Sequence, residues 1–192
     1  MATKDHQSEP IESASETLQR IFDGHGSVLG SQMADESSRY DVLKKTDFPK
    51  PQRTRRIAVA NQKGGVGKTT STVNTAAALA NKGAQVLVID MDPQGNASTA
   101  LGVSHASGEP SVYDVIEGRS DLGDVITVCP DFPTLDVVPA SIDLSGAELE
   151  VADLPNRNTL LKEALDLYLR QSDKHYDYVF IDCPPSLGLL VI

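Results

Sequence analysis

Short apolar runs alternate with longer amphipathic segments through the last two thirds of the chain. The runs predict four β-strands, over residues 57–60, 85–90, 135–138 and 178–182. The run at 85–90 is apolar without interruption from Val86 to Ile89, which is typical of a parallel strand covered on both faces. Between the first two strands, the Ala-rich segment 68–82 predicts a helix that Gly83 ends. Strand, helix and strand together form a right-handed βαβ unit.

A further amphipathic segment precedes the last predicted strand. Residues 158–170 predict a helix whose apolar side is formed by Leu161, Leu165, Tyr168 and Leu169. Alternating strands and helices are typical of the α/β class, so we expect a mostly parallel, doubly wound sheet with helices on both faces. The sequence ends in the apolar run 189–192 without a cap or a polar tail, and we therefore expect a truncated sequence and an incomplete sheet.

Residues 1–55 are predicted to form a flexible, disordered N-terminal extension to a folded domain over residues 56–192. The extension contains three glycines and several Ser and Asp residues, and it has too few apolar residues to bury a core of its own. Within it, apolar residues recur at helical spacing near residues 11–22, with glutamates early and an arginine late, which favours a short helix there. Two interpretations stay open, namely a helix that docks on a partner and a transient helix in a disordered arm.

The net charge of −10 lies on the predicted folded domain. Residues 1–56 contain as many basic as acidic residues, so the whole excess of negative charge falls on residues 57–192. Such a domain is a poor non-specific DNA binder, because phosphate contacts need Lys and Arg. A nucleic-acid surface would be a local patch, the N-terminal arm or a part of the protein outside this sequence. The basic residues between Lys44 and Arg56 either contact DNA phosphates or form a solvated linker.

Other features concern the cellular compartment. Cys129 and Cys183 are too few for a disulfide framework and indicate reduced thiols in a cytosolic protein. No apolar run approaches the roughly 18 residues that a membrane-spanning helix needs, and the polar start has no secretion signal. The four histidines show no metal-ligand spacing. We therefore expect a cytoplasmic protein, with no indication of a membrane partner in this part.

A glycine-rich turn joins the first predicted strand to the helix that follows it. Glycines let the backbone approach a polyphosphate, and successive N–H groups and the helix N-terminus then attract its oxygens. Such a P-loop indicates nucleotide binding, with Lys68 at the β- and γ-phosphates and Thr69 on Mg²⁺. The hydroxyl of Thr70 is placed to reach the α-phosphate. The predicted nucleotide-binding residues are Lys63, Gly64, Gly65, Val66, Gly67, Lys68, Thr69 and Thr70.

Aspartates end two of the predicted strands. Because the carboxyl ends of strands in a P-loop sheet face the phosphates, Asp92 is predicted to hold an attacking water in line with the γ-phosphate. The alternative for Asp92 is a turn-opening residue before Pro93. Asp90, at the strand end, has either a structural role or contacts Mg²⁺ through water. Asp182 follows four apolar residues in a Walker B arrangement, which delivers a carboxylate to Mg²⁺ through its water shell.

These motifs resemble the ParA/MinD group of ATPases. Residues 63–70 are similar to its deviant Walker A motif. The ordinary motif would have Gly at position 62, whereas this chain has Gln62 followed by an extra lysine, Lys63. Residues 90–98, Asp-Met-Asp-Pro-Gln-Gly-Asn-Ala-Ser, resemble the second motif of the ParA/Soj chromosome-partitioning branch. Residues 139–148 and 176–188 are also similar to that branch, so the resemblance covers the whole predicted domain.

The resemblance implies the fold of a P-loop NTPase, its cofactors ATP and Mg²⁺, and roles for single residues. Lys63 would reach across a nucleotide-sandwich homodimer to the partner's ATP phosphates, and Asp92 would position the hydrolytic water. Lys63, Lys68 and Asp92 would then form the catalytic set. Hydrolysis should be slow, because the visible sequence offers no dedicated arginine finger.

The resemblance also implies partners. In the family, the ATP dimer binds DNA non-specifically, and a ParB-type centromere-binding protein stimulates hydrolysis and releases the DNA. This implies a switch for chromosome or plasmid segregation that associates with the nucleoid. The family's DNA-contacting and adenine-facing residues lie mostly in a C-terminal half outside this sequence, so neither set can be carried over.

Two other functions stay open from the sequence. One is a positioning or scaffolding ATPase that places a protein assembly at a membrane or a cell pole, with the N-terminal arm as its docking peptide. The other is a metabolic relative that couples the P-loop to electron or metal transfer. That function expects a cysteine-ligated cluster, for which Cys183 is a weak candidate.

Overall fold

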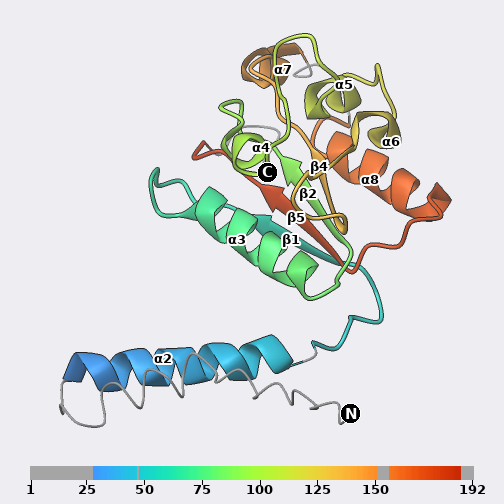
Figure 1. Ribbon diagram of the computed structural model, residues 1–192. Helices are drawn as coiled ribbons and strands as arrows, with labels where there is room; N and C mark the ends of the chain where they lie inside the picture. Colours follow the sequence, from blue (N-terminus) through green and yellow to red (C-terminus); the bar gives the residue numbers. More distant parts are fainter. Residues whose placement is uncertain (1–27, 47, 151–155, 187–192) are drawn as a thin grey trace, which may run out of the picture. The chain divides into compact units, whose positions relative to one another are not determined.

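The computed structural model describes residues 28–46, 48–150 and 156–186, and it divides the chain into two compact units, Met1–Phe48 and Pro49–Ile192 (Figure 1). The first unit contains helix α2, Val28–Lys45, which the sequence analysis did not predict. Its last turn carries Lys44 and Lys45, where positive charge suits the helix dipole. The short helix predicted near residues 11–22 lies outside the described residues. The division into a flexible extension and an ATPase domain at residue 55 stays a prediction.

The second unit is built on a five-stranded sheet with the strand order β1-β5-β2-β4-β3. Strands β1, β5, β2 and β4 run parallel to one another, whereas the short β3 pairs antiparallel with β4. The prediction of a mostly parallel sheet is therefore confirmed. The bounds of the strands are Arg55–Val59 for β1, Val86–Asp90 for β2, Thr127–Val128 for β3, Leu135–Val138 for β4 and Tyr178–Asp182 for β5.

Helices cover both faces of this sheet. Successive residues of β2 point to opposite sides, as in any strand. Leu87 and Ile89 belong to a core cluster with residues of α5, α6 and α8, whereas Val86 and Val88 belong to a cluster with Ala76 of α3. Figure 1 shows α3 and α8 on either side of the strands. The helices of this unit are α3 Lys68–Asn81, α4 Asn96–Ala100, α5 Val112–Ile116, α6 Leu122–Val125, α7 Leu144–Glu150 and α8 Leu160–Gln171.

The register of the parallel strands brings three strand ends together. Val59 at the end of β1 lies opposite Asp182 at the end of β5, and Asp182 lies opposite Asp90 at the end of β2. The loops that leave β1, β2 and β5 therefore start from the same edge of the sheet. Ligands of open α/β sheets bind at this edge, because the connections that follow parallel strands gather there.

Candidate functional site

The glycine-rich turn forms the loop between β1 and α3. Gly65 and Gly67 have φ angles of 70° and 87°, in the left-handed region that side chains with a Cβ disfavour. A Cβ built on either glycine would meet no heavy atom within 4 Å, so the loop borders open space rather than packed protein. Gly67 is also the N-cap of α3, and no side chain caps that helix. The backbone N–H groups of its first turn thus point to the same space.

A cleft of about 920 Å³ opens at this edge of the sheet. Its wall is formed by the P-loop and first turns of α3, the turn after β2, α4, the start of α7 and the segment after β5. The cleft is lined by Gly64, Gly65, Gly67, Lys68, Thr69, Thr70, Val73, Asn74, Asp92, Pro93, Gln94, Asn96, Ala100, Ser145, Pro184, Pro185 and Ser186. The structure thus brings most of the predicted P-loop residues together with Asp92 around one cavity.

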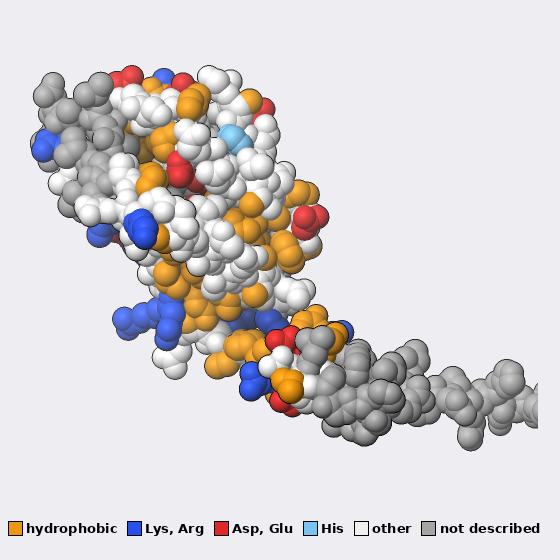
Figure 2. All heavy atoms as spheres, turned by 90° about the vertical axis from the view of Figure 1, so that its left-hand side faces the viewer, with side chains coloured by type: hydrophobic (Ala, Val, Ile, Leu, Met, Phe, Trp, Pro, Cys, Tyr) orange, Lys and Arg blue, Asp and Glu red, His pale blue; other side chains and the backbone are white. Residues whose placement is uncertain are grey.

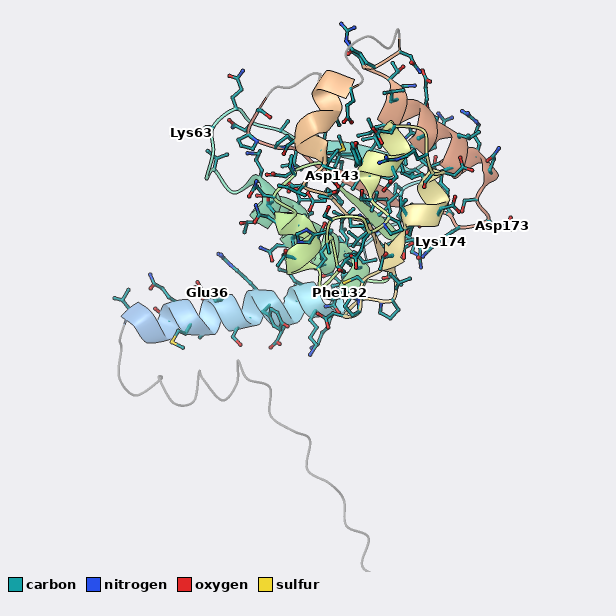
Figure 3. All side chains as sticks on the ribbon, turned by 90° about the horizontal axis from the view of Figure 1, so that it is seen from above. Glu36, Lys63, Phe132, Asp143, Asp173 and Lys174 are labelled. Carbon is teal, nitrogen blue, oxygen red and sulfur yellow. The ribbon has the colours of Figure 1, made fainter. Side chains whose placement is uncertain are left out.

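Four predicted site residues do not line this cleft. Lys63 is exposed at the outer side of the loop (Figure 3), and Val66 is 44% exposed. The N–H of Lys63 donates to Asn61 Oδ1 at 2.9 Å, which holds the start of the loop while the lysine side chain stays outside the cleft wall. Asp90 and Asp182 are fully buried behind the wall.

Asp182 is held by two threonine hydroxyls of α3. Thr69 Oγ1 donates to its Oδ2 at 2.7 Å, and Thr72 Oγ1 lies 3.0 Å from its Oδ1. Burial raises the pKa of Asp182 above its usual range, and the Asp92 charge adds to this rise. The hydrogen bonds from the two hydroxyls and the nearby Lys68 charge act in the opposite direction and favour the carboxylate. The Walker B residue is therefore tied to the first turn of the P-loop helix.

Asp90 is engaged inside the protein. Its Oδ2 accepts hydrogen bonds from the N–H and the hydroxyl of Ser98, both at 2.8 Å, and its Oδ1 accepts from the N–H of Asp92 at 3.1 Å. Ser98 Oγ in turn accepts from the N–H of Ala140 at 3.1 Å. Asp90 thereby joins the turn after β2, helix α4 and, through Ser98, the segment that follows β4. These contacts fit the structural one of its two predicted roles, and the water-mediated Mg²⁺ contact stays a prediction.

Burial raises the pKa of Asp90 from its usual 3.8 to about 6, although the hydrogen bonds from Ser98 and Asp92 oppose the rise and the Asp182 charge adds to it. The native state therefore binds this proton more tightly than the unfolded chain does. Ionisation of Asp90 consequently lowers the stability of the fold as the pH rises from about 4 to about 6.

Asp92 lines the cleft together with the P-loop residues and keeps only 8% of its surface exposed. Its Oδ1 accepts a hydrogen bond from the N–H of Gln94 at 3.0 Å, and its carbonyl oxygen accepts one from the N–H of Gly95 at 2.8 Å. Asp92 thus opens a tight turn and also presents a carboxylate to the cleft, so the two alternatives for this residue are compatible.

Two further site residues, Thr72 and Ser98, were not predicted. Both are fully buried, and the hydroxyl of each donates a hydrogen bond to a buried carboxylate. A Thr one helical turn after Lys68 and a Ser eight residues after Asp90 are common residue types at ordinary spacings. The sequence therefore carries no signal that singles them out.

The described residues limit what else the site can hold. Among them, no group of three or more His, Cys, Asp and Glu side chains is gathered as a metal site. Cys183, next to Asp182, is buried, and burial raises the pKa of its thiol, which disfavours the nucleophilic thiolate. Within the same described part of the chain, no helix has the length and apolar character to cross a bilayer.

Comparison with known proteins places the chain in a family. The model of the family described as "AAA domain" matches residues 54–192. The chain belongs to the AAA domain family. This match covers all but the first five residues of the second compact unit, including the P-loop and both aspartate motifs.

The relatives of this AAA domain chain include partitioning proteins. It is 49% identical over 136 residues to the sporulation initiation inhibitor protein Soj of Bacillus subtilis, a match that covers 71% of the chain and 52% of Soj. It is 46% identical over 136 residues to the chromosome partitioning protein ParA of Caulobacter vibrioides, covering 71% of the chain and 50% of ParA. The predicted relationship to the ParA/Soj group is thereby confirmed. The chain spans about half the length of these curated relatives.

A solved structure shares the fold of this AAA domain at appreciable identity. The cobyrinic acid a,c-diamide synthase of Mycobacterium smegmatis, with a bound ATP analogue and magnesium, is 41% identical and superposes with a TM-score of 0.64. The match covers 71% of this chain and 54% of the synthase. The predicted P-loop NTPase fold is confirmed by this likeness and by the family assignment.

We predict that Ser98→Ala raises the pKa of Asp90 above about 6, because the hydroxyl that favours the carboxylate is lost. The substitution should also lower the free energy of unfolding by about 1–3 kcal/mol, since the N–H of Ala140 loses its acceptor. Side-chain carboxyl NMR over a pH series measures the first effect, and urea unfolding the second.

The matched control is Ser172→Ala, because the Ser172 hydroxyl only accepts the N–H of Lys174 after α8. It should leave the pKa of Asp90 unchanged. An unaltered Asp90 titration in Ser98→Ala would contradict the assigned hydrogen-bond network.

Proposed function

We propose that this chain binds ATP with Mg²⁺ in the P-loop cleft and hydrolyses it slowly, as the nucleotide switch of a dimeric DNA-segregation ATPase. The observation that carries the proposal is the hydrogen bond from Thr69 Oγ1 to Asp182 Oδ2, formed beside Lys68 at the wall of the cleft. It joins the two motifs that ATP-binding P-loop proteins use for phosphate and magnesium.

The residues around the cleft fit a polyphosphate. The open loop of Gly64, Gly65 and Gly67 and the uncapped start of α3 offer N–H donors, and Lys68 adds a positive charge. The oxygens of a bound anion would accept hydrogen bonds from these N–H groups, which no side chain caps at the start of α3. Thr70, which also lines the cleft, would donate its hydroxyl to a further phosphate oxygen.

Magnesium fits the two residues next to this cradle. The Thr69 hydroxyl donates a hydrogen bond to Asp182, which leaves the lone pairs of its oxygen for a cation. Asp182 lies behind Thr69 and would act through water, as expected for an ion that keeps several of its water ligands. When bound, Mg²⁺ neutralises negative charge on the phosphate oxygens.

Asp92 would serve as the residue that orients the attacking water. It lines the same cleft as the P-loop, and the Gln94 N–H fixes one of its carboxylate oxygens. A carboxylate held in this way can accept a hydrogen bond from water and direct it. Lys63 would not act in the cleft of its own chain, since its side chain lies outside the cleft wall.

The position of Lys63 supports a dimer. A cation on the outer side of the loop is available to the nucleotide of a second protomer rather than to the chain's own cleft. Exposed hydrophobic side chains accompany it, including Val66 on the same loop and Ile142 before α7, which are 44% and 51% exposed. Figure 2 shows hydrophobic side chains at the surface on the side of the chain that carries this loop. Apolar surface of this kind favours association.

The link to DNA segregation comes from the relatives. Soj and ParA, which share close to half of their residues with this chain over the matched region, are named for sporulation control and chromosome partitioning. We infer that the protein works in the same process, associated with the nucleoid and with a ParB-type partner. DNA contacts would come mainly from the C-terminal half outside this sequence, or from the N-terminal arm or a local basic patch, because residues 57–192 carry an overall excess of acidic residues.

Lys68→Ala should weaken the binding of Mg·ATP by about 10–100-fold, because a charge-assisted contact to the phosphates is lost. Equilibrium titration with a fluorescent ATP analogue measures this loss. Lys45→Ala, which removes an exposed lysine of α2, is the control and should bind as the unaltered protein does. Equal affinity of the Lys68 variant would overturn the assignment of the cleft.

Asp92→Ala should reduce hydrolysis at least about a hundredfold while the ATP-bound dimer persists, since the water loses its orienting carboxylate but the phosphate cradle is intact. Phosphate release and light scattering measure the two properties. Asp173→Ala, at an exposed aspartate after α8, is the control. A monomeric Asp92 variant that hydrolyses ATP normally would refute the role.

The full-length protein should sediment with duplex DNA in ATP but not in ADP, and added salt should weaken this retention. The physical reason is that only the ATP dimer would double the number of phosphate contacts. Retention that is the same with both nucleotides, or absent with both, would favour the positioning ATPase instead.

A further inference from the structure

A histidine outside the cleft lies against the turn that carries Asp92. Gly95, the N-cap of α4, has a φ of 62°, and a Cβ built on it would lie 2.5 Å from both Cε1 and Nδ1 of His105 and 2.9 Å from Cγ. The imidazole ring therefore occupies the space where any other residue at position 95 would place its side chain. The turn and the ring are in direct contact.

The ring is also fixed at its other end. His105 Nε2 and Thr99 Oγ1 form a hydrogen bond of 2.9 Å, and the Thr99 N–H donates to the Gly95 carbonyl at 2.9 Å. The imidazole thus spans one turn of α4, from Gly95 to Thr99. A five-residue helix such as α4 gains little stability from its own hydrogen bonds, so contacts of this kind hold it in place.

The loop around His105 is itself anchored. Glu109 Oε2 accepts hydrogen bonds from Ser104 Oγ at 2.5 Å and from the N–H of Ala106 at 3.2 Å, the residues on either side of the histidine. The N–H of Val103 donates to the Ser98 carbonyl at 2.9 Å, and Val103 is buried. Hydrogen bonds on both sides of His105 therefore fix the loop that places its ring against Gly95.

We infer that His105 is a positioning residue for Asp92. The contact passes from the imidazole to Gly95, from the Gly95 N–H to the Asp92 carbonyl, and from the Gln94 N–H to the Asp92 carboxylate. By restricting Gly95, the ring holds the turn in which Asp92 faces the cleft. The role in hydrolysis rests on the proposed function, whereas the restriction of the turn does not.

Amide hydrogen exchange in the nucleotide-free protein tests the restriction. In His105→Ala, the amides of Gln94 and Gly95 should exchange about three- to tenfold faster, because the turn opens more often. The Met91 amide, bonded to the Asp182 carbonyl at 2.9 Å within the sheet, should be unaffected. Unchanged exchange at Gln94 and Gly95, or equal acceleration at Met91, would overturn the inference.

Two further variants sharpen the test. His105→Gln, whose terminal amide reaches the place of Nε2, should restore slow exchange through the bond to Thr99. His175→Ala removes a histidine with 63% of its side chain exposed and should leave both amides unchanged. If exchange in the glutamine variant is as fast as in the alanine variant, the hydrogen bond to Thr99 does not help to restrict the turn, and this part of the inference is wrong.

Kinetics then test the consequence for catalysis. His105→Ala should lower kcat for ATP hydrolysis about three- to tenfold and leave the Kd for Mg·ATP unchanged, since the P-loop is untouched. If the unaltered protein does not bind ATP, the proposed function fails, while altered exchange at Gln94 and Gly95 still supports the positioning of Asp92. An unchanged kcat in a hydrolysing protein would overturn the catalytic role of this contact.

Discussion

The parallel register of β1, β5 and β2 is the constraint on which the site depends. Because Val59, Asp182 and Asp90 end their strands side by side, the three loops that follow must leave the same edge of the sheet. The P-loop, the turn with Asp92 and the segment after Asp182 are therefore neighbours in space although they are far apart in the chain. The apolar clusters on both faces of the sheet keep this register fixed, since a shift of one residue would expose them.

Two buried carboxylates at this edge have different tasks. Burial raises the pKa of both Asp90 and Asp182, and hydrogen bonds from neighbouring hydroxyls oppose that rise. The donors of Asp90 come from Ser98 of α4, so this aspartate fastens the turn after β2 to the sheet. The donors of Asp182 come from α3, so this aspartate fastens the P-loop helix. The P-loop and the turn with Asp92 are thus held to the sheet by separate carboxylates.

His105 adds a third attachment on the outer side of the same turn. Its ring lies against Gly95, whereas Asp90 holds the turn from the inner side through the N–H of Asp92. The turn that carries Asp92 is thus held at both Asp92 and Gly95.

The sequence by itself determined the four main strands, the helix after the P-loop and the amphipathic helix before β5, because these have strong apolar periods. It also identified the P-loop and three aspartates, since glycines and carboxylates at strand ends form a recognisable order. It did not predict α2, whose apolar residues do not recur on one side of a helix, or α4 to α7, which are too short to show a period. Only the tertiary structure decided that Ser98 and Thr72 serve the carboxylates, that Lys63 lies outside the cleft and that His105 covers Gly95. Those relations join residues of ordinary type across loops, and a contact between distant segments leaves no pattern along the chain.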